Sequence, residues 1–516
     1  MGASVIFLEM STKSTSRRAR RRSRPVSSGQ DWDRRHLPGL QLHESEKLLV
    51  GFLGFLLLFL PWALGSTLVL PQVIALCIAV LSLGAALLPR HGETHTVTSG
   101  GQFRRLLSFP VFWFGLLFLG LLSIQGFNTS HLVEGTEEFR FLTEQESLSF
   151  LPTGIAALFT ESNAFRSLVI AATPFFGICA AWIGLTRRKS IHLLLTLLAV
   201  NGLAIAALAF HQVAKGQALV LWFYEPPASI FFGPFLFHWQ AAAFLTVVMA
   251  AVVGMAAHHY ARARRSFRRS NPSGLFIFIA LALMLISIFS SSRAAAAISG
   301  GMLAAFVAHI GYRELTAETF LSRKIFVAVS GVVLVAIGML IVGNVASNYL
   351  EQRELNRKVS APIASFENWE ASRAISLSLF KEKPLFGWGG GSFPHLYQDV
   401  AEREEIENAP ETLEAEYAAS DWFRMLAEFG IVGSLLLLLP FLYLLKHFFR
   451  AQTFQNPLIG FLLLGVASGS ILILGSPLLQ NSAFTTTWLL LLTFGAVLIR
   501  VESAAKSRAE MRESDT

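Results

Sequence analysis

The sequence predicts an all-α, polytopic membrane protein with about twelve transmembrane helices and one large helical loop on the outer side. The chain of 516 residues is 53% hydrophobic and only 15% charged, whereas soluble globular proteins carry roughly 25% charged residues. It also contains long apolar runs, such as those at 48–66 and 325–343. Each run is long enough to cross a bilayer as a helix, which rises about 1.5 Å per residue.

The apolar spans alternate with polar loops whose charge sets the predicted topology. The spans are expected at about 48–64, 68–88, 109–126, 167–186, 191–211, 237–257, 274–290, 294–312, 325–345, 424–445, 457–474 and 484–500. Basic loops begin at Arg187, Ala261, Arg313 and Lys446, and both termini belong to the same basic set. Because positive charge marks cytoplasmic loops, both termini are expected in the cytoplasm, as an even number of spans requires.

This topology divides the chain into five parts. They are a basic cytoplasmic tail (1–46), transmembrane helices one to nine (47–344), a large periplasmic loop (345–421), transmembrane helices ten to twelve (422–500) and a second cytoplasmic tail (501–516). The first tail contains RRARRRSR, a polybasic run that can bind anionic membrane lipid, and it is read as part of an uncleaved signal anchor.

The net charge and the cysteine content argue against a nucleic-acid-binding protein and against a disulfide-stabilised one. The net charge of +8 is accounted for by the cytoplasmic loops, so no nucleic-acid partner is expected. Cys77 and Cys179 lie inside apolar runs, and we expect them to be buried small hydrophobic residues that form no disulfide framework.

Three arginines on the predicted outer side are candidates for binding an anionic group. Arg293 interrupts the apolar run SIFSSSRAAAAISGG near the outer mouth. An arginine at membrane depth costs roughly 2.5–3.5 kcal/mol on insertion scales, which makes it a functional candidate, and its guanidinium can bind phosphate as a fork. The alternative is a turn residue that stays in water. Arg166 and Arg373 either converge on the same anion or are surface charges.

The large loop contains the glycine-rich stretch FGWGGGSF at 386–393. A helix is expected over 369–380, and Pro384 ends it. The stretch lacks the lysine of a phosphate-binding GxxxxGK[ST] loop and the βαβ context of a dinucleotide fingerprint. Its glycines instead favour a sharp turn and a close backbone approach.

Charged residues also mark the start of the tenth span. Asp421, Arg424 and Glu428 are three and four residues apart, so they share one helix face. They form either an ion-pair patch at the membrane interface or a polar face that looks into an outward cavity.

These segments resemble the O-antigen ligase and polymerase superfamily. Its members show Pro-Leu-Phe-Gly-x-Gly-x-Gly-x-Phe, as in KEKPLFGWGGGSFPHLY, and then His-Asn-x-x-Leu-x-x-x-x-Glu-x-Gly-x-x-Gly, whose end matches Glu428, Gly430 and Gly433. Arg293 falls in the family's Ser-Arg element, and FGPFLFHW resembles a weaker Gly-Pro-Phe element. The resemblance covers about residues 45–500.

The resemblance implies a membrane glycosyltransferase that uses no metal and no nucleotide cofactor. Such enzymes move a glycan from a polyprenyl-pyrophosphate carrier to a glycan, a lipid A core or a protein, at the outer face of the bacterial inner membrane. Arg293, with Arg166 and Arg373 in second place, would stabilise the pyrophosphate leaving group. A general base must take the proton of the acceptor.

The sequence departs from the superfamily at two positions. The His-Asn pair of the second motif falls on Ala419 and Ser420, so the expected histidine is missing, and the candidates for the base are His395, Asp421 and Glu428. His238 stands where many relatives carry arginine, and His238 and Trp388 are the candidates for contacts with the substrate.

Two other functions remain as alternatives to the enzyme. They are a secondary transporter and a non-catalytic subunit of a polysaccharide export system. Transporters place ionisable residues and broken helices near the midplane of the membrane, whereas the polar residues of this chain gather at the outer mouth, which favours the enzyme.

Overall fold

The computed structural model describes the chain in eleven stretches and shows an almost entirely helical unit from Glu44 onward. The described stretches are 43–91, 96–97, 99–135, 140–217, 219–225, 231–266, 271–290, 292–315, 366–406, 420–449 and 456–514. The basic run of the N-terminal tail and the predicted ninth span, at 325–345, lie outside them.

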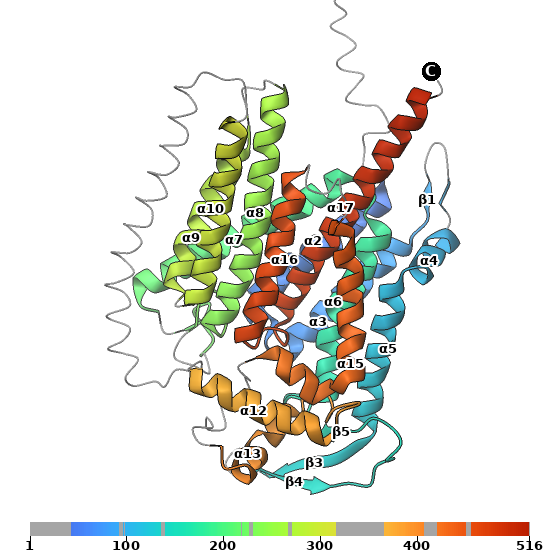
Figure 1. Ribbon diagram of the computed structural model, residues 1–516, viewed down its shortest axis with the longest axis vertical. Helices are drawn as coiled ribbons and strands as arrows, with labels where there is room; N and C mark the ends of the chain where they lie inside the picture. The colour runs from blue at the N-terminus through green and yellow to red at the C-terminus, as the bar shows by residue number, and fades with distance from the viewer. Residues whose placement is uncertain are drawn as a thin grey trace, which may run out of the picture. The chain divides into compact units, whose positions relative to one another are not determined.

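The helices of the described residues follow the predicted spans closely (Figure 1). In chain order they are α2 (Glu44–Trp62), η3 (Leu64–Ser66), α3 (Val69–Leu87), α4 (Ser99–Leu107), α5 (Pro110–Phe127), α6 (Ala164–Gly184), α7 (Arg188–Lys215), α8 (His238–Ser266), α9 (Ser273–Phe289), α10 (Arg293–Leu315), α12 (Phe366–Glu382), α13 (Phe393–Arg403), α15 (Asp421–Leu445), η4 (Lys446–Phe449), α16 (Pro457–Gly475) and α17 (Ser482–Ser514). Ten are long and apolar enough to cross a membrane, and α9 is a shorter apolar helix. The predicted all-α, polytopic fold is confirmed.

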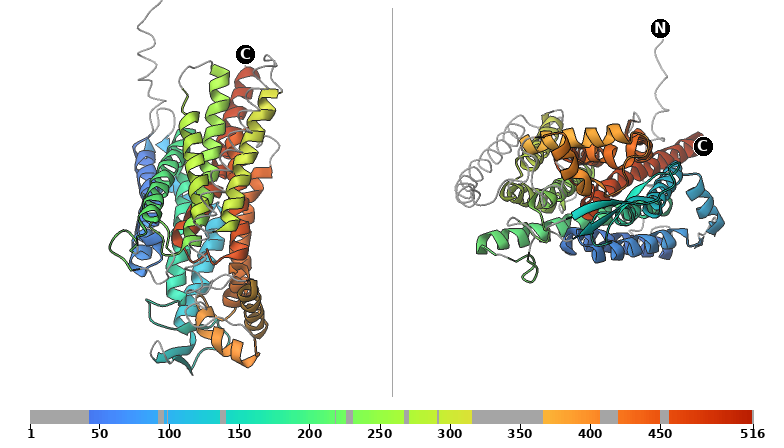
Figure 2. Two further views of the ribbon diagram at one scale, coloured as in Figure 1. Left: turned by 90° about the vertical axis from the view of Figure 1, so that its left-hand side faces the viewer. Right: turned by 90° about the horizontal axis from the view of Figure 1, so that it is seen from below.

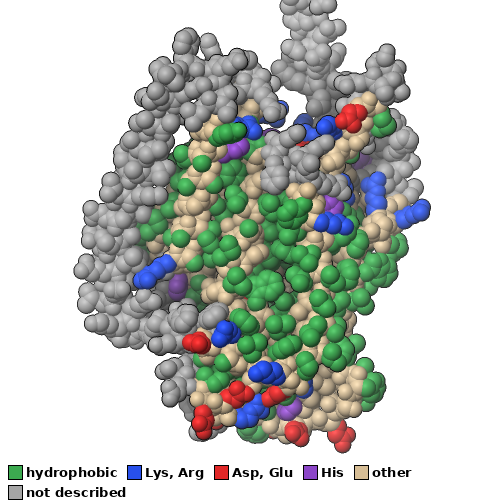
Figure 3. Space-filling view, viewed as in Figure 1, with side chains coloured by type: hydrophobic (Ala, Val, Ile, Leu, Met, Phe, Trp, Pro, Cys, Tyr) green, Lys and Arg blue, Asp and Glu red, His purple; other side chains and the backbone are tan. Residues whose placement is uncertain are grey.

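Helices α8 and α17 form the centre of the bundle. Helix α8 packs against α7, α9, α10, α16 and α17, and α17 also packs against α6. Exposed leucines, phenylalanines and tryptophans lie on outer helices such as α5, where Trp113 and Leu117 are exposed. Figure 3 shows hydrophobic side chains over the middle of the bundle and charged side chains toward its two ends. This distribution is the one expected of a protein that faces lipid along its middle.

A soluble head lies at one end of the bundle and is built from α12, α13 and a small sheet (Figures 1 and 2). Strands β3 (Thr129–Gly135), β4 (Arg140–Glu144) and β5 (Gly154–Ala156) pair in the order β4-β3-β5. The β3–β4 pair is antiparallel, and the β3–β5 pair is parallel. The sheet is an addition to the predicted all-helical plan. A separate two-stranded hairpin joins β1 (Arg90–His91) and β2 (Thr96–Val97).

The two cysteines differ in their surroundings. Cys179 on α6 is buried, as predicted, whereas Cys77 on α3 is exposed. The prediction of burial is therefore wrong for Cys77, because its apolar helix presents that side chain at the outer surface of the bundle. Both thiols are free.

A buried carboxylate joins the start of α7 to α2. Glu46 is 1% exposed, and its carboxylate accepts hydrogen bonds from Thr186 Oγ1 at 2.8 Å and Ser190 Oγ at 2.6 Å. It also accepts from the backbone N–H groups of Thr186 and Arg187, both at 3.2 Å. These donors lie around the N-terminus of α7, where a negative charge is stabilising.

We expect Glu46→Gln to lower the free energy of unfolding by about 2 kcal/mol. The carboxylate accepts charge-assisted hydrogen bonds, whereas the NH2 group of glutamine would face hydrogen-bond donors and could accept none of them. The Tm of the purified protein in detergent measures this loss. Glu44→Gln is the matched control, since Glu44 lies on the same helix and its side chain is 85% exposed beside Lys47. Equal Tm values for the two variants would contradict the role of Glu46.

Candidate active site

Helix α15 is interrupted at Gly430, and the loop after α12 fills the break. Gly430 has φ 61° and ψ −163°, which lies outside helical geometry. The carbonyl groups of 427–428 accept hydrogen bonds from the N–H groups of 388–389 at 3.0 and 2.9 Å. The N–H groups of 431–432 donate to the carbonyl groups of 384–385 at 2.9 and 3.0 Å. The loop thus satisfies the backbone groups that the break leaves unpaired in a buried place.

The close contact between loop and helix requires glycine on both sides. A Cβ atom on Gly387, whose φ is +69°, would lie 2.4 Å from the carbonyl carbon of Glu428. A Cβ atom on Gly430 would lie 2.5 Å from the carbonyl carbon of Leu385. The prediction that the glycine-rich stretch serves a close backbone approach is confirmed, and its partners are α15 and the segment before α6.

Gln125 on α5 binds the same loop through two hydrogen bonds. Its side chain is fully buried. Its Nε2 donates to the carbonyl of Phe386 at 2.9 Å, and its Oε1 accepts from the N–H of Gly390 at 3.2 Å. The residues Gly387–Gly391, named here the glycine loop, therefore form a fixed joint between α5, α15 and the head.

A cluster of buried charges lies on α15 just before the break. Asp421, Arg424 and Glu428 are 3%, 2% and 4% exposed. The Nε atom of Arg424 lies 2.8 Å from Oε1 of Glu428, so the two side chains form an ion pair one helical turn apart. Asp421 Oδ2 accepts from the N–H groups of 478–479 at 2.5 and 2.6 Å. The ion pair expected from the sequence is present, and it is buried.

Gln480 completes this cluster from the connection between α16 and α17. With its side-chain amide oriented so that the oxygen faces Arg424, Gln480 accepts a hydrogen bond from Nη1 at 2.9 Å and another from Nη2. This orientation satisfies both groups, which is the basis on which amide orientations are assigned. The guanidinium of Arg424 is therefore held by Glu428 on one side and by Gln480 on the other.

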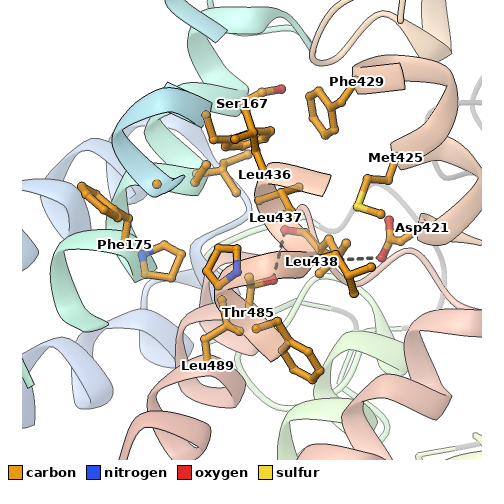
Figure 4. Close-up of a pocket in the computed structure, with 18 of the residues that line it drawn as sticks. Ser167, Phe175, Asp421, Met425, Phe429, Leu436, Leu437, Leu438, Thr485 and Leu489 are labelled. Atoms are coloured by element: carbon orange, nitrogen blue, oxygen red, sulfur yellow. Dashed lines mark hydrogen bonds between the residues drawn. The ribbon is translucent and has the colours of Figure 1, made fainter. Parts of the chain in front are cut away.

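The charged cluster lines a large cavity between α5, α6, α15 and α17 (Figure 4). The cavity and the open space at its mouth together measure about 1470 Å³. Its wall is mostly apolar and includes Phe175 of α6, Leu436 of α15 and Leu489 of α17, whereas Asp421, Arg424, Glu428 and Gln480 supply polar groups. A site of this kind suits a ligand with a long apolar part and a polar part.

A smaller polar chamber adjoins the large cavity. Its lining includes Thr67, Ser162, Arg166, Ser167, Ile170, Gln240 and Gln480. Ser167, Ile170 and Gln480 line both spaces, so the two are neighbours. Gln480 thus lies where the apolar cavity meets the polar chamber.

Arg166, predicted to bind pyrophosphate, lies on the first turn of α6 in the wall of the polar chamber. Its Nη1 donates to the carbonyl of Thr160 at 2.9 Å, its Nη2 to the carbonyl of Thr67 at 2.8 Å, and its Nε to Oε1 of Gln72 at 3.3 Å. These bonds fix the side chain across α3 and α6, so its charge has a defined position.

His395, one of the three candidate bases, lies on α13 beside the polar chamber. Its Nε2 is 2.7 Å from the carbonyl oxygen of Ser162, a residue that lines the chamber. A carbonyl oxygen can only accept a hydrogen bond, so Nε2 carries the proton. In the neutral ring the basic nitrogen is then Nδ1.

Trp388 lies in the head and outside the lining of both cavities. Its Nε1 donates to the carbonyl of Leu379 at 3.2 Å. The Nζ atom of Lys383 lies 3.8 Å from the centroid of its ring and donates to Thr153 Oγ1 at 2.9 Å. Burial lowers the pKa of Lys383. One face of the Trp388 ring is therefore already covered by a cation.

The remaining candidates lie on three different helices. Arg293 begins α10 and is exposed, and α10 packs against α8, α9 and α16. Arg373 is exposed on α12. His238 begins α8 with its ring edge-on to Trp239 at 5.1 Å. Ala419, at the position of the missing family histidine, lies outside the described residues.

Four of the predicted site residues therefore lie around the two neighbouring cavities, and the other four are not among the described residues that line them. Arg166, His395, Asp421 and Glu428 lie around the two neighbouring cavities. Arg293, Arg373, His238 and Trp388 contribute to neither lining in the part of the chain that the structure describes. Sequence reasoning assigned no role to Arg424, Gln480 or Gln125. Only Arg424 gave a signal, through its spacing from two carboxylates.

The fold and the cavity define a class of polytopic membrane proteins in which a head domain packs on a helical bundle that holds a mostly apolar cavity with buried charges. Residues 275–438 match the family model described as O-antigen ligase. This match supports the resemblance to the O-antigen ligase and polymerase superfamily that the sequence motifs indicated. The matched region runs from α9 through the glycine loop to the broken part of α15. No curated protein matches the chain.

Proposed function

We propose that this protein is a glycosyltransferase that moves a glycan from a polyprenyl-pyrophosphate carrier to a glycan, a lipid A core or a protein. The family match supports a membrane glycosyltransferase in general. The observation that carries the specific proposal is the large cavity, whose apolar wall meets the buried charges of Arg424, Glu428 and Asp421. A polyprenyl chain fits the apolar wall, and the pyrophosphate and sugar fit the polar side.

In this reaction the oxygen of an acceptor hydroxyl forms a bond with the anomeric carbon of the donor. The bond between that carbon and the pyrophosphate oxygen breaks, and the pyrophosphate leaves with the electron pair. Arginines placed near the leaving group stabilise its developing charge. We assign this role to Arg293, Arg166 and Arg373 together, of which Arg166 lies beside the cavity in the described residues.

The proton of the acceptor must pass to a base, and we assign this role to His395. Its Nε2 donates to the carbonyl of Ser162, so Nδ1 is the basic nitrogen of the neutral ring. The carboxylates of the alternative candidates are engaged by other groups. Glu428 is paired with Arg424, and Asp421 accepts two backbone hydrogen bonds.

We also propose that the head faces the periplasm of the inner membrane and that both termini are cytoplasmic. The head and the C-terminus lie at opposite ends of the described bundle (Figure 1). The basic loops after Arg187 and Lys446 lie at the cytoplasmic ends of their helices in this arrangement. The division into tails, spans and the loop 345–421 belongs to the same proposal.

We expect Arg293→Ala to reduce glycan transfer by roughly 10²–10³-fold, the loss typical of removing one donor from a charge-stabilising site. The measurement is transfer from a polyprenyl-pyrophosphate-linked glycan by the purified, reconstituted protein. Arg403→Ala is the control, because Arg403 is an exposed arginine of α13 that pairs with Glu382. Normal transfer by Arg293→Ala would remove Arg293 from the mechanism.

Glycan profiles of a deletion strain test the proposed function as a whole. Full-length chains that accumulate on the carrier would identify a ligase, whereas loss of polymer with single repeat units retained would identify a polymerase. An unchanged profile in the deletion strain, together with no transfer by the reconstituted protein, would contradict both.

A further inference from the structure

The guanidinium of Arg424 is capped by a neutral amide at the junction of the two cavities. Its Nε contacts Glu428, and the edge formed by Nη1 and Nη2 binds the amide oxygen of Gln480. Arg424 lines the large cavity, and Gln480 lines both spaces. The side chain of Arg424 is only 3% exposed, so this charge lies inside the site rather than on its rim.

Asp421 binds the segment that carries this amide. Its carboxylate accepts hydrogen bonds from the N–H groups of Leu478 and Leu479. These residues directly precede Gln480 in the connection between α16 and α17. Because Asp421 and Arg424 are on the same helix turn, the carboxylate fixes the connection so that Gln480 meets the guanidinium. We therefore regard Asp421 as a positioning residue for this contact.

The two-nitrogen edge of a guanidinium matches two oxygens of a phosphate, and such charge-assisted contacts are stronger than hydrogen bonds to neutral acceptors. An amide oxygen in this place is a weaker acceptor that a phosphate can displace. The amide side chain can leave by rotation about its own bonds, without any change in α15.

We propose that Arg424 binds a phosphate group of the lipid-linked donor and that Gln480 occupies this place until the donor arrives. The inference rests on the proposed function, because it takes a polyprenyl pyrophosphate as the ligand. The superfamily motif that includes Glu428 leaves the position of Arg424 unspecified, so the motif assigns no role to this residue. Gln480 is then an internal competitor of the substrate.

This competition predicts effects of opposite sign for the two partners. Arg424→Gln removes the cation and weakens binding of the pyrophosphate by about tenfold or more. Gln480→Ala removes the competitor and strengthens binding several-fold. Arg424→Lys keeps the charge but loses the fork, so its affinity lies between those of the wild type and Arg424→Gln.

The experiment measures the Kd of full-length, detergent-purified protein for undecaprenyl pyrophosphate and, separately, for undecaprenol. Tryptophan fluorescence is a suitable signal, because Trp422 and Trp488 line the cavity. We expect the variants of Arg424 and Gln480 to change the Kd of the pyrophosphate and to leave the Kd of undecaprenol unchanged. Gln480→Ala with weaker or unaltered pyrophosphate binding would overturn the proposal, as would equal effects on both probes.

A variant with both charges removed separates a loss of binding from a folding defect. Arg424→Gln alone leaves Glu428 buried without its partner, which is strongly destabilising. Arg424→Gln with Glu428→Gln removes both charges at nearly constant volume, and a melting curve shows whether it folds. The folded double variant is expected to bind pyrophosphate weakly, and wild-type affinity in this variant would also overturn the proposal.

The same measurements separate this proposal from the proposed function. If the wild type transfers glycan while the Arg424 variants bind the carrier normally, the role of Arg424 fails and the glycosyltransferase function stands. If the wild type binds no undecaprenyl pyrophosphate, both fail.

Discussion

Gly387→Ala is expected to abolish glycan transfer and to lower the Tm sharply. The new Cβ atom would lie 2.4 Å from both the carbonyl carbon and the carbonyl oxygen of Glu428 and 2.6 Å from the N of Phe429. All of these atoms belong to the backbone of α15, so no side chain can rotate away. The φ of +69° adds strain for any residue with a Cβ atom.

The consequence of this clash is separation of the glycine loop from the break in α15. Hydrogen bonds to 427–428 and from 431–432 would be lost together. Each contributes about 1 kcal/mol net, and each buried backbone group left without a partner costs roughly 1–3 kcal/mol. Because α13 follows the loop directly, α13 and its residue His395 would move as well.

The Tm and the elution profile of the detergent-purified variant measure this effect, with transfer as the functional readout. Gly460→Ala is the matched control, since Gly460 lies within the membrane helix α16 and a Cβ atom there meets nothing within 4 Å. We expect the control to match the wild type or to gain slightly from the better helix propensity of alanine. A Gly387→Ala variant that melts and transfers like the control would show that the loop is not a fixed joint.

The helical fold was predictable because a long apolar run can adopt few backbone structures in lipid. With no water to bind their backbone groups, such runs must form helices, and the predicted spans fall on helices wherever the structure describes them. The sheet of the head was not predictable in the same way. Its strands are short, as β5 with three residues shows, and they pair across a register shift between Thr129 and His131.

The site was predictable only as far as local spacing reaches. The positions of Asp421, Arg424 and Glu428 show that they share a helix face, but not that this face is buried. Burial depends on contacts made far along the chain, such as those of Asp421 with Leu478, 57 residues away. Likewise the glycine stretch indicates a close approach, whereas its partner Gln125 lies 261 residues from Phe386. Its apolar surroundings and the family's Ser-Arg element drew attention to Arg293, which lies on α10, a helix that does not contribute to the described cavity wall.

His395→Gln is expected to reduce kcat for glycan transfer by roughly 10²–10⁴-fold, the contribution typical of a positioned general base. Glutamine can still donate from its amide to the carbonyl of Ser162, so the contact between α13 and the segment before α6 is kept. It has no basic nitrogen to replace Nδ1. The Tm and the KM for the donor should therefore change little while kcat falls, a combination that a purely structural role would not produce.

His211→Gln, at an exposed histidine of α7, is the control and should transfer normally. Full turnover by His395→Gln would exclude His395 as the base and transfer that role to Asp421 or Glu428.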